Sequence, residues 1–311
     1  MMKEGSPFAH WLHISCLLCG NSDSEVVFPG RWETGLGGGF GRYFSSSRLR
    51  AVYGPIVRCT HCGFVYANPQ PPPSELERVY RRLVDNAYAD EEPARTRTAE
   101  RMLALVERHC PKKGSLLDVG CSIGIFLRCA QRNGWQVLGV EPSSWAIEQC
   151  QMRGIPVLQG FIETITLSSE SFDVVTMWDV LEHTLNPVQA LKKVHDALKP
   201  DGFLFINVPN IESVAARLLR HRWPLLLVEH LWYFSPSTLK SLLERNGFRL
   251  LAIVPHWITF SLKFVLFRLI QQGILPASLQ RWVESAALLR RVFITFTMGE
   301  MTAVAKKEGI S

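Results

Sequence analysis

The stretch Leu116-Leu-Asp-Val-Gly-Cys-Ser-Ile-Gly124 decides the fold of this chain. Its apolar first half is typical of a buried strand, and the glycines at 120 and 124 permit a tight turn into a helix that begins near Ile125. In open α/β sheets such a turn lies at the carboxyl edge, where ligands bind. The stretch therefore predicts a parallel α/β sheet with a ligand site directly after this strand.

Strands and helices alternate on both sides of this turn. Strands are expected over residues 115–119, 136–141, 157–159, 172–177, 203–208, 248–254 and 301–306. Helices are expected over residues 74–83, 93–109, 125–133, 144–153 and 187–198. The pattern predicts a doubly wound, Rossmann-like α/β fold with a seven-stranded sheet. The chain has 311 residues, 47% of them hydrophobic, which is enough for such a core.

The chemistry of the expected ligand follows from two carboxylates. Glu141 ends the second strand of this pattern, 23 residues after Asp118, where it can accept both hydroxyls of an adenosine ribose. The sequence lacks the G-x-G-x-x-G turn of nicotinamide-binding folds, and Asp118 would repel a pyrophosphate. A carboxylate there suits a ligand that carries an ammonium group.

At these residues the chain resembles the class I methyltransferases that depend on S-adenosylmethionine (SAM). The resemblance covers residues 74–311 and includes Gly139-Val-Glu-Pro-Ser143 and Lys199-Pro-Asp-Gly202. It is strongest to O-methyltransferases of ubiquinone biosynthesis and to small-molecule methyltransferases with an N-terminal zinc module. One departure is Ser122, which stands where many members have glycine. The resemblance implies that SAM is the cofactor.

The resemblance also implies which residues surround the cofactor. The turn would supply backbone, Glu141 would hold the ribose, residues 161–163 would flank the adenine, and residues 178–179 would line the methionine end. The implied set is Tyr88, Asp118, Gly120, Cys121, Ser122, Gly124, Glu141, Phe161, Ile162, Glu163, Trp178 and Asp179. For Phe161 and Trp178, packing in the core is the alternative.

Two histidines are candidates for catalysis. An imidazole can take a proton from a hydroxyl acceptor at neutral pH, and His183 follows the strand over 172–177 at the cofactor edge. His230 is the second candidate, because its loop lies on the expected substrate side. A structural role for His183 is the alternative. We expect O-methylation of a small-molecule or lipid-linked acceptor. The closest variant is C-methylation of a sugar or other metabolite, and a carbon acceptor that is already acidic would need no such base.

Nucleic acid is the less favoured class of substrate. Residues 211–311 carry 13 basic against 6 acidic side chains, and zinc modules with basic charge also occur in RNA methyltransferases. However, Trp178-Asp-Val180 replaces the Asn/Asp-Pro-Pro-aromatic motif of enzymes that act on base amines. The Pro-Cys nucleophile of 5-methylcytosine enzymes is also missing. An RNA methyltransferase and a zinc-binding adaptor without catalysis are the remaining alternatives.

Two CxxC motifs, each followed by glycine, predict a structural zinc site at Cys16, Cys19, Cys59 and Cys62.

Eight cysteines without a signal-peptide pattern favour reduced thiols and a cytoplasmic location, with a membrane-peripheral position as the variant. A glycine-rich loop is expected at 35–41. The proline-rich segment 68–73 is expected to separate a zinc-ribbon module (1–73) from the methyltransferase domain (74–311).

An apolar excursion over residues 257–275 lies within an expected helical insert over 257–296. Wound as a helix, it would place Ile258, Leu262, Val265, Leu266 and Leu269 on one face. Its charged residues make it a poor membrane span. A peripheral membrane contact, a dimer surface, a wall over an apolar substrate pocket and an ordinary lid are the alternatives. The sequence does not predict the oligomeric state.

Overall fold

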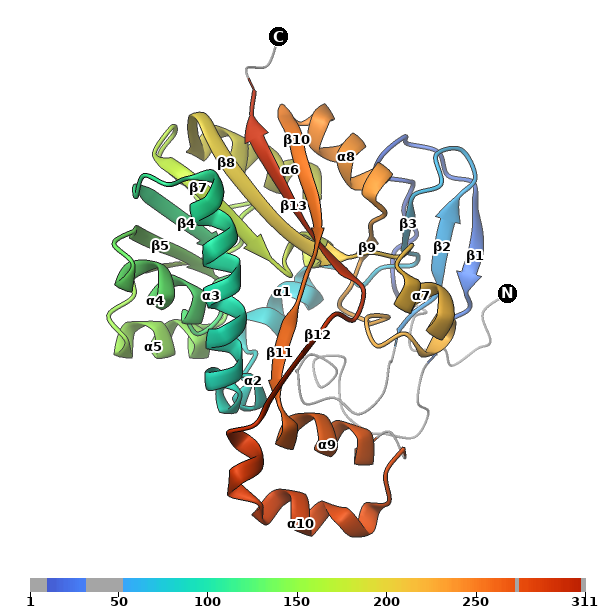
Figure 1. Ribbon diagram of the computed structural model, residues 1–311. Helices are drawn as coiled ribbons and strands as arrows, with labels where there is room; N and C mark the ends of the chain where they lie inside the picture. Colours follow the sequence, from blue (N-terminus) through green and yellow to red (C-terminus); the bar gives the residue numbers. More distant parts are fainter. Residues whose placement is uncertain (1–9, 32–52, 272–273, 309–311) are drawn as a thin grey trace.

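The computed structural model describes residues 10–31, 53–271 and 274–308. Its main sheet has seven strands in the order β10-β13-β8-β7-β4-β5-β6 (Figure 1). The strands are β4 (Ser115–Val119), β5 (Gln136–Glu141), β6 (Val157–Gln159), β7 (Phe172–Trp178), β8 (Leu198–Pro209), β10 (Phe248–Pro255) and β13 (Glu300–Lys307). The five from β4 to β8 run parallel, while β13 pairs antiparallel with β8 and with β10. This confirms the predicted fold.

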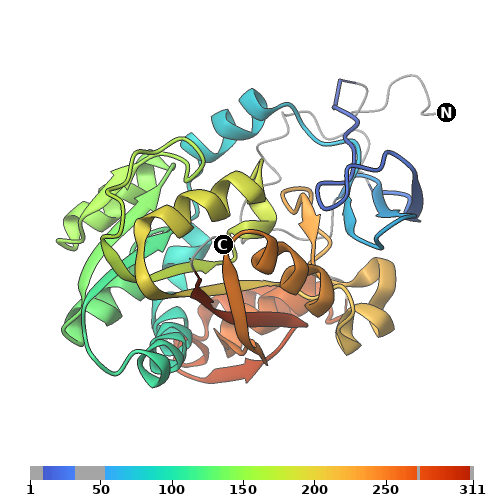
Figure 2. The same ribbon diagram turned by 90° about the horizontal axis from the view of Figure 1, so that it is seen from above.

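Helices cover both faces of the sheet (Figure 2). Leu116 on β4 packs in a core with helices α3 (Glu92–His109), α4 (Ile125–Arg132) and α5 (Ser144–Met152). The next residue, Leu117, packs in the opposite core with α6 (Pro187–Ala197) and α8 (Pro236–Arg245). Successive side chains of a strand point to opposite faces, so a continuous apolar run is what a sheet covered on both faces requires.

A second sheet joins the N-terminal residues to the rest of the molecule. It consists of β1 (Ser24–Phe28), β2 (Ile56–Cys59), β3 (Val65–Ala67) and β9 (Trp232–Tyr233), all antiparallel. Strand β9 belongs to the C-terminal half of the chain. Its Trp232 stacks on Phe64, with ring centroids 6.0 Å apart and planes 11° from parallel. Strand pairing and aromatic packing therefore fasten the cysteine-bearing segment to the loop that follows β8.

The insert differs from the predicted helix. Residues 258–261 form strand β11 (Ile258–Ser261), which pairs with β12 (Phe293–Phe296), and helix α9 begins only at Leu262 (Leu262–Gln271). The prediction of Ile258 on a helix face is therefore wrong. The N–H of Thr259 donates to Thr98 Oγ1 at 2.9 Å and that of Ser261 to Glu91 at 2.8 Å, so contacts with α3 and its cap support the extended backbone.

The remaining helices are short: α1 (Pro73–Arg81), α2 (Asn86–Asp90), α7 (Val214–Leu219) and α10 (Gln280–Ser285). Helices α1 and α2 follow the proline-rich segment, which itself contacts the N-terminal residues through an isolated bridge between Leu12 and Gln70. Of the helices in the described ranges, none has the length and apolar character needed to cross a membrane. The glycine-rich segment 35–41 lies outside the described residues.

Candidate active site

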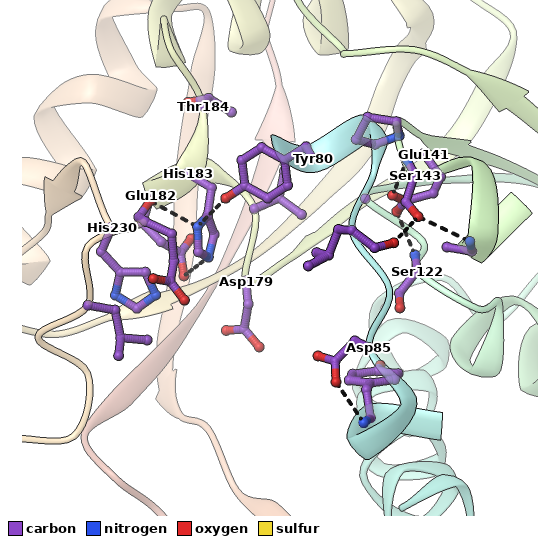
Figure 3. Close-up of a pocket in the computed structure, with 18 of the residues that line it drawn as sticks. Tyr80, Asp85, Ser122, Glu141, Ser143, Asp179, Glu182, His183, Thr184 and His230 are labelled. Atoms are coloured by element: carbon purple, nitrogen blue, oxygen red, sulfur yellow. Dashed lines mark hydrogen bonds and ion pairs between the residues drawn. The ribbon is translucent and has the colours of Figure 1, made fainter. Parts of the chain in front are cut away.

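A cavity of about 560 Å³ lies at the carboxyl ends of β4, β5 and β7. Helices α1 and α2, the loop before β9 and the β11–α9 insert complete its walls. Figure 3 shows Glu141 with Ser122 and Ser143 on one side of the cavity and Glu182, His183 and His230 on the other. The cavity therefore connects the predicted cofactor turn with both candidate histidines.

Glu141 is held rigidly at the cofactor side. Its two carboxylate oxygens accept the backbone N–H groups of Ser122 and Ser143, each at 2.9 Å, and its side chain is buried. Gly120 has a φ of +69°, and a Cβ there would lie 2.5 Å from Val180 Cγ2. Only glycine therefore leaves both the turn and the cavity wall undisturbed at this position.

Ten of the fourteen predicted cofactor and catalytic residues line this cavity. They are Tyr88, Gly120, Ser122, Glu141, Phe161, Ile162, Glu163, Asp179, His183 and His230. The cavity wall does not include the other four, which are Asp118, Cys121, Gly124 and Trp178.

The four residues outside the wall have structural surroundings. Asp118 faces the core, where Thr176 Oγ1 donates to it at 2.6 Å. Trp178 packs edge-on against Phe126 at 5.4 Å, so the alternative of core packing describes its position. Cys121 is buried in the core under α4, and Gly124, with a φ of +76°, caps that helix.

His183 is neutral and firmly oriented. Its Nδ1 lies 3.0 Å from the carbonyl oxygen of Glu229 and 2.9 Å from the Tyr80 hydroxyl. Since a carbonyl oxygen only accepts, Nδ1 carries the proton and Nε2 keeps a free lone pair. Burial lowers the pKa of His183 to about 4, so the ring is uncharged at neutral pH. An uncharged imidazole with a free lone pair can accept a proton.

His230 and Glu182 lie beside His183. The two imidazole rings are 4.6 Å apart, and His230 Nδ1 donates to the carbonyl oxygen of Leu225 at 2.8 Å. The Glu182 carboxylate is fully buried, and neither of its oxygens has a hydrogen-bond partner among the described residues. Ligand atoms of these three side chains lie within 4.8 Å of one another. This corner could hold a divalent cation.

Three acidic side chains at and behind the cavity are partly protonated at neutral pH. Burial raises the pKa of Asp118 to about 8, that of Glu141 to about 7 and that of Asp179 to about 6. The folded chain thus holds these protons more tightly than the unfolded chain does. Their contribution to stability is present at low pH and is lost as the pH rises through these values.

We therefore expect these three carboxyl groups together to lower the free energy of unfolding of the ligand-free protein by about 2–3 kcal/mol between pH 6.5 and 8, most of it through Asp118. Asp118→Asn keeps an acceptor for Thr176 but cannot ionise, so it should flatten this dependence. Denaturant titrations at several pH values measure it, with exposed Glu148→Gln as the control. If the free energy of unfolding changed with pH equally in wild type and Asp118→Asn, the raised pKa assigned to Asp118 would be contradicted.

Sequence reasoning missed several cavity residues, notably Tyr80, Arg95, Arg268 and Glu300. Arg95 lies over the Tyr88 ring at 4.3 Å and lowers the pKa of the Asp179 carboxyl, against the larger effect of burial. These residues come from α1, α3, α9 and β13, far apart in the chain. No local motif marks them, and only the packing of the helices and the insert brings them together.

The four cysteines of the two CxxC motifs gather as predicted. Cys16 Sγ lies 3.4 Å from Cys62 Sγ, Cys19 Sγ lies 3.5 Å from Cys59 Sγ, and all four sulfurs lie within 4.8 Å. Tetrahedral zinc with bonds of about 2.3 Å would separate its sulfurs by about 3.8 Å. The cluster therefore has the donor set and dimensions of a closed zinc site.

Comparison with known proteins agrees with this geometry. A family model described as a methyltransferase domain matches residues 80–253, more than half of the chain. The chain belongs to this methyltransferase family. SAM is the cofactor of the family. The match contains Glu141, both candidate histidines and the glycine turn.

Curated relatives of this methyltransferase include two ubiquinone biosynthesis O-methyltransferases. The mitochondrial human protein is 31% identical over 176 residues, which cover 50% of this chain and 48% of the relative. The Coxiella burnetii protein is 28% identical over 174 residues, which cover 52% of this chain and 72% of that relative. The chain thus spans about half the length of the human relative that it matches.

Among solved structures, a SAM-dependent methyltransferase from Thermotoga maritima matches with a TM-score of 0.48 and 18% identity. The match covers 70% of this chain and 91% of the other.

Proposed function

We propose that this chain transfers a methyl group from SAM to an oxygen atom of a small-molecule or lipid-linked acceptor. The observation that carries the proposal is the single cavity that joins Glu141 to His183 and His230. Bound SAM supplies an electrophilic methyl group. The protein then has to hold an acceptor beside that methyl, exclude water and remove one proton.

The residues at the cofactor side fit SAM. A carboxylate has about four acceptor positions, and backbone N–H groups use one on each oxygen of Glu141. The remaining positions suit the two hydroxyls of a ribose. Asp179 and Arg95 also line the cavity and offer a negative and a positive group, which suit the ammonium and carboxylate of the methionine part.

At the acceptor side, His183 would take the proton of the acceptor hydroxyl on Nε2. The Glu229 carbonyl fixes its tautomer, and the Tyr80 hydroxyl restrains the ring. The ubiquinone O-methyltransferase relatives favour oxygen as the methylated atom. Aromatic and aliphatic side chains of β11, α9 and β12 form one wall of the cavity, which favours an apolar acceptor over a nucleic acid.

The four-cysteine cluster would hold one structural zinc ion. Four thiolates close the coordination shell, so the ion has no open position for a catalytic water. Its place is on the second sheet, away from the cavity, where it would maintain the fold of the N-terminal segment.

The function is tested most directly by SAM binding. Glu141→Ala removes the proposed ribose contact, and the loss of hydrogen bonds to a charged group should weaken SAM about 10- to 100-fold. Calorimetry measures the affinity, and Glu148→Ala on the exposed face of α5 is the control. Equal affinity in Glu141→Ala, or tighter binding of NAD than of SAM by wild type, would reject the assignment.

A further inference from the structure

Two aromatic rings of the wall formed by β11 and α9 lie next to two guanidinium groups. Phe260 and Phe264 stack with centroids 4.8 Å apart and planes 11° from parallel. The Arg95 guanidinium lies 5.3 Å from the centroid of Phe260, and that of Arg268 lies 5.9 Å from the centroid of Phe264. All four residues line the cavity. Two stacked rings thus separate one arginine from the other.

The two arginines have different electrostatic surroundings. Arg95 acts on the carboxyls of Asp179 and Glu300, whose pKa values it lowers against the larger effect of burial. Neither arginine forms an ion pair among the described residues, and each has a buried nitrogen, Arg95 Nε and Arg268 Nη1, without a hydrogen-bond partner there. Burial lowers the pKa of Arg268, and no described acidic group opposes that shift.

An arginine stays charged even when it is buried, and a buried charge without a partner is costly. Its planar donor groups match the oxygens of carboxylates and phosphates. The structure around Arg268 offers an apolar surface, a cation and no anion among the described residues. Such an arrangement is suited to a ligand that carries its own negative group.

We propose that Arg268 binds an anionic group, a carboxylate or a phosphate, on the methyl acceptor, whose apolar body lies along Phe260 and Phe264. This inference rests on the proposed function for its statement that the ligand is the acceptor. It makes the acceptor amphipathic, with the reacting group near His183 and the acidic group on the α9 side. Arg268 is thus a residue that determines acceptor specificity.

The test uses three rigid aromatic probes: 1-naphthyl phosphate, 1-naphthoate and uncharged 1-naphthol. Their affinities are measured by calorimetry on the full chain, with and without saturating S-adenosylhomocysteine. We expect at least one anion to bind wild type about 10- to 100-fold more tightly than naphthol. Comparing the affinities of 1-naphthyl phosphate and 1-naphthoate shows which anion Arg268 prefers.

The variants isolate the guanidinium. Arg268→Met keeps an unbranched apolar chain on the wall, so it should bind naphthol normally and lose the preference for anions. Arg268→Lys should retain part of the preference. Arg281→Met, at an exposed position on α10, should behave like wild type. Thermal unfolding of each variant confirms that the fold is intact.

Three results would overturn the inference. One is an absence of anion preference in wild type, and another is an unchanged preference in folded Arg268→Met. The third is a preference that disappears when S-adenosylhomocysteine is bound, because Arg268 would then serve the cofactor. If S-adenosylhomocysteine itself fails to bind wild type, the proposed function fails. The probe affinities measured without S-adenosylhomocysteine then still decide whether Arg268 is an anion site.

Discussion

Removing the zinc ion proposed for the four-cysteine cluster should lower methyl transfer about 100-fold or more while SAM binding changes little. Strand pairing, ring stacking and hydrogen bonds link the sheet that bears the cluster to the acceptor side of the cavity. Strand β3, directly after the second CxxC motif, pairs with β9, and Phe64 stacks on Trp232. The N–H of Ala67 donates to the Leu231 carbonyl at 2.9 Å.

The coupling continues into the active site. The N–H of Leu231 donates to the carbonyl oxygen of Glu182 at 2.8 Å, and His230 and His183 are the neighbours of these two residues. Structural zinc contributes about 10–16 kcal/mol to the folding of small zinc modules. Its loss would release β9, and a shift of about 1 Å in a catalytic group can cost about 100-fold in rate. Glu141 and the glycine turn lie at the ends of β5 and β4, where the backbone N–H groups of Ser122 and Ser143 hold the Glu141 carboxylate.

Cys59→Ser is the variant to measure, with Cys110→Ser as a control at a cysteine outside the cluster. Elemental analysis gives the zinc content, calorimetry the SAM affinity, and turnover is measured once an acceptor is identified. We expect one zinc per wild-type chain. Well under one zinc per chain in carefully purified protein would reject the zinc site. A loss of SAM affinity in Cys59→Ser as large as the loss of turnover would reject the prediction that only the acceptor side of the cavity depends on the zinc.

His183→Ala should lower turnover by about 10²- to 10⁴-fold and leave SAM affinity nearly intact. The reason is positional. His183 lies on the side of the cavity opposite Glu141, and its free Nε2 is the atom that can take the proton of an acceptor hydroxyl. Single-turnover methyl transfer as a function of pH is the measurement, with exposed His221→Ala as the control.

Two outcomes would change the role of His183. An unchanged rate and pH profile in His183→Ala would make it structural and direct attention to His230. Activity that is lost on chelation with EDTA and restored by a divalent cation, in a protein whose cysteine cluster keeps its zinc, would assign His183 to a cation site with Glu182 and His230. Their ligand atoms are close enough for that role.

The sequence predicted the elements that depend on local pattern. Strands over 115–119, 136–141 and 157–159 match the structure, because buried parallel strands are short apolar runs bounded by turn residues. The gathering of the cysteines was predictable because two CxxC motifs together supply the four thiolates of one tetrahedral zinc site. Glu141 was predictable because the carboxyl ends of adjacent parallel strands meet at one edge of the sheet.

Other features depend on contacts between residues far apart in the sequence. The apolar run from Ile258 suits a strand or a helix, and only pairing with β12 and contacts with Thr98 and Glu91 select the strand. Strand β9 has only two residues, too few for a periodic signal, yet it joins the two sheets.

This chain's sequence by itself determined the seven-stranded α/β fold, the cysteine cluster and the placement of Glu141 beside the glycine turn, since these follow from local periodicity and from motifs within one turn or one strand end. Only the tertiary structure decided that Asp118 and Trp178 face the core and that Arg95 and Arg268 face the cavity. The direction in which a side chain points at the end of a strand or on a helix depends on what packs against it. That information lies in distant parts of the chain.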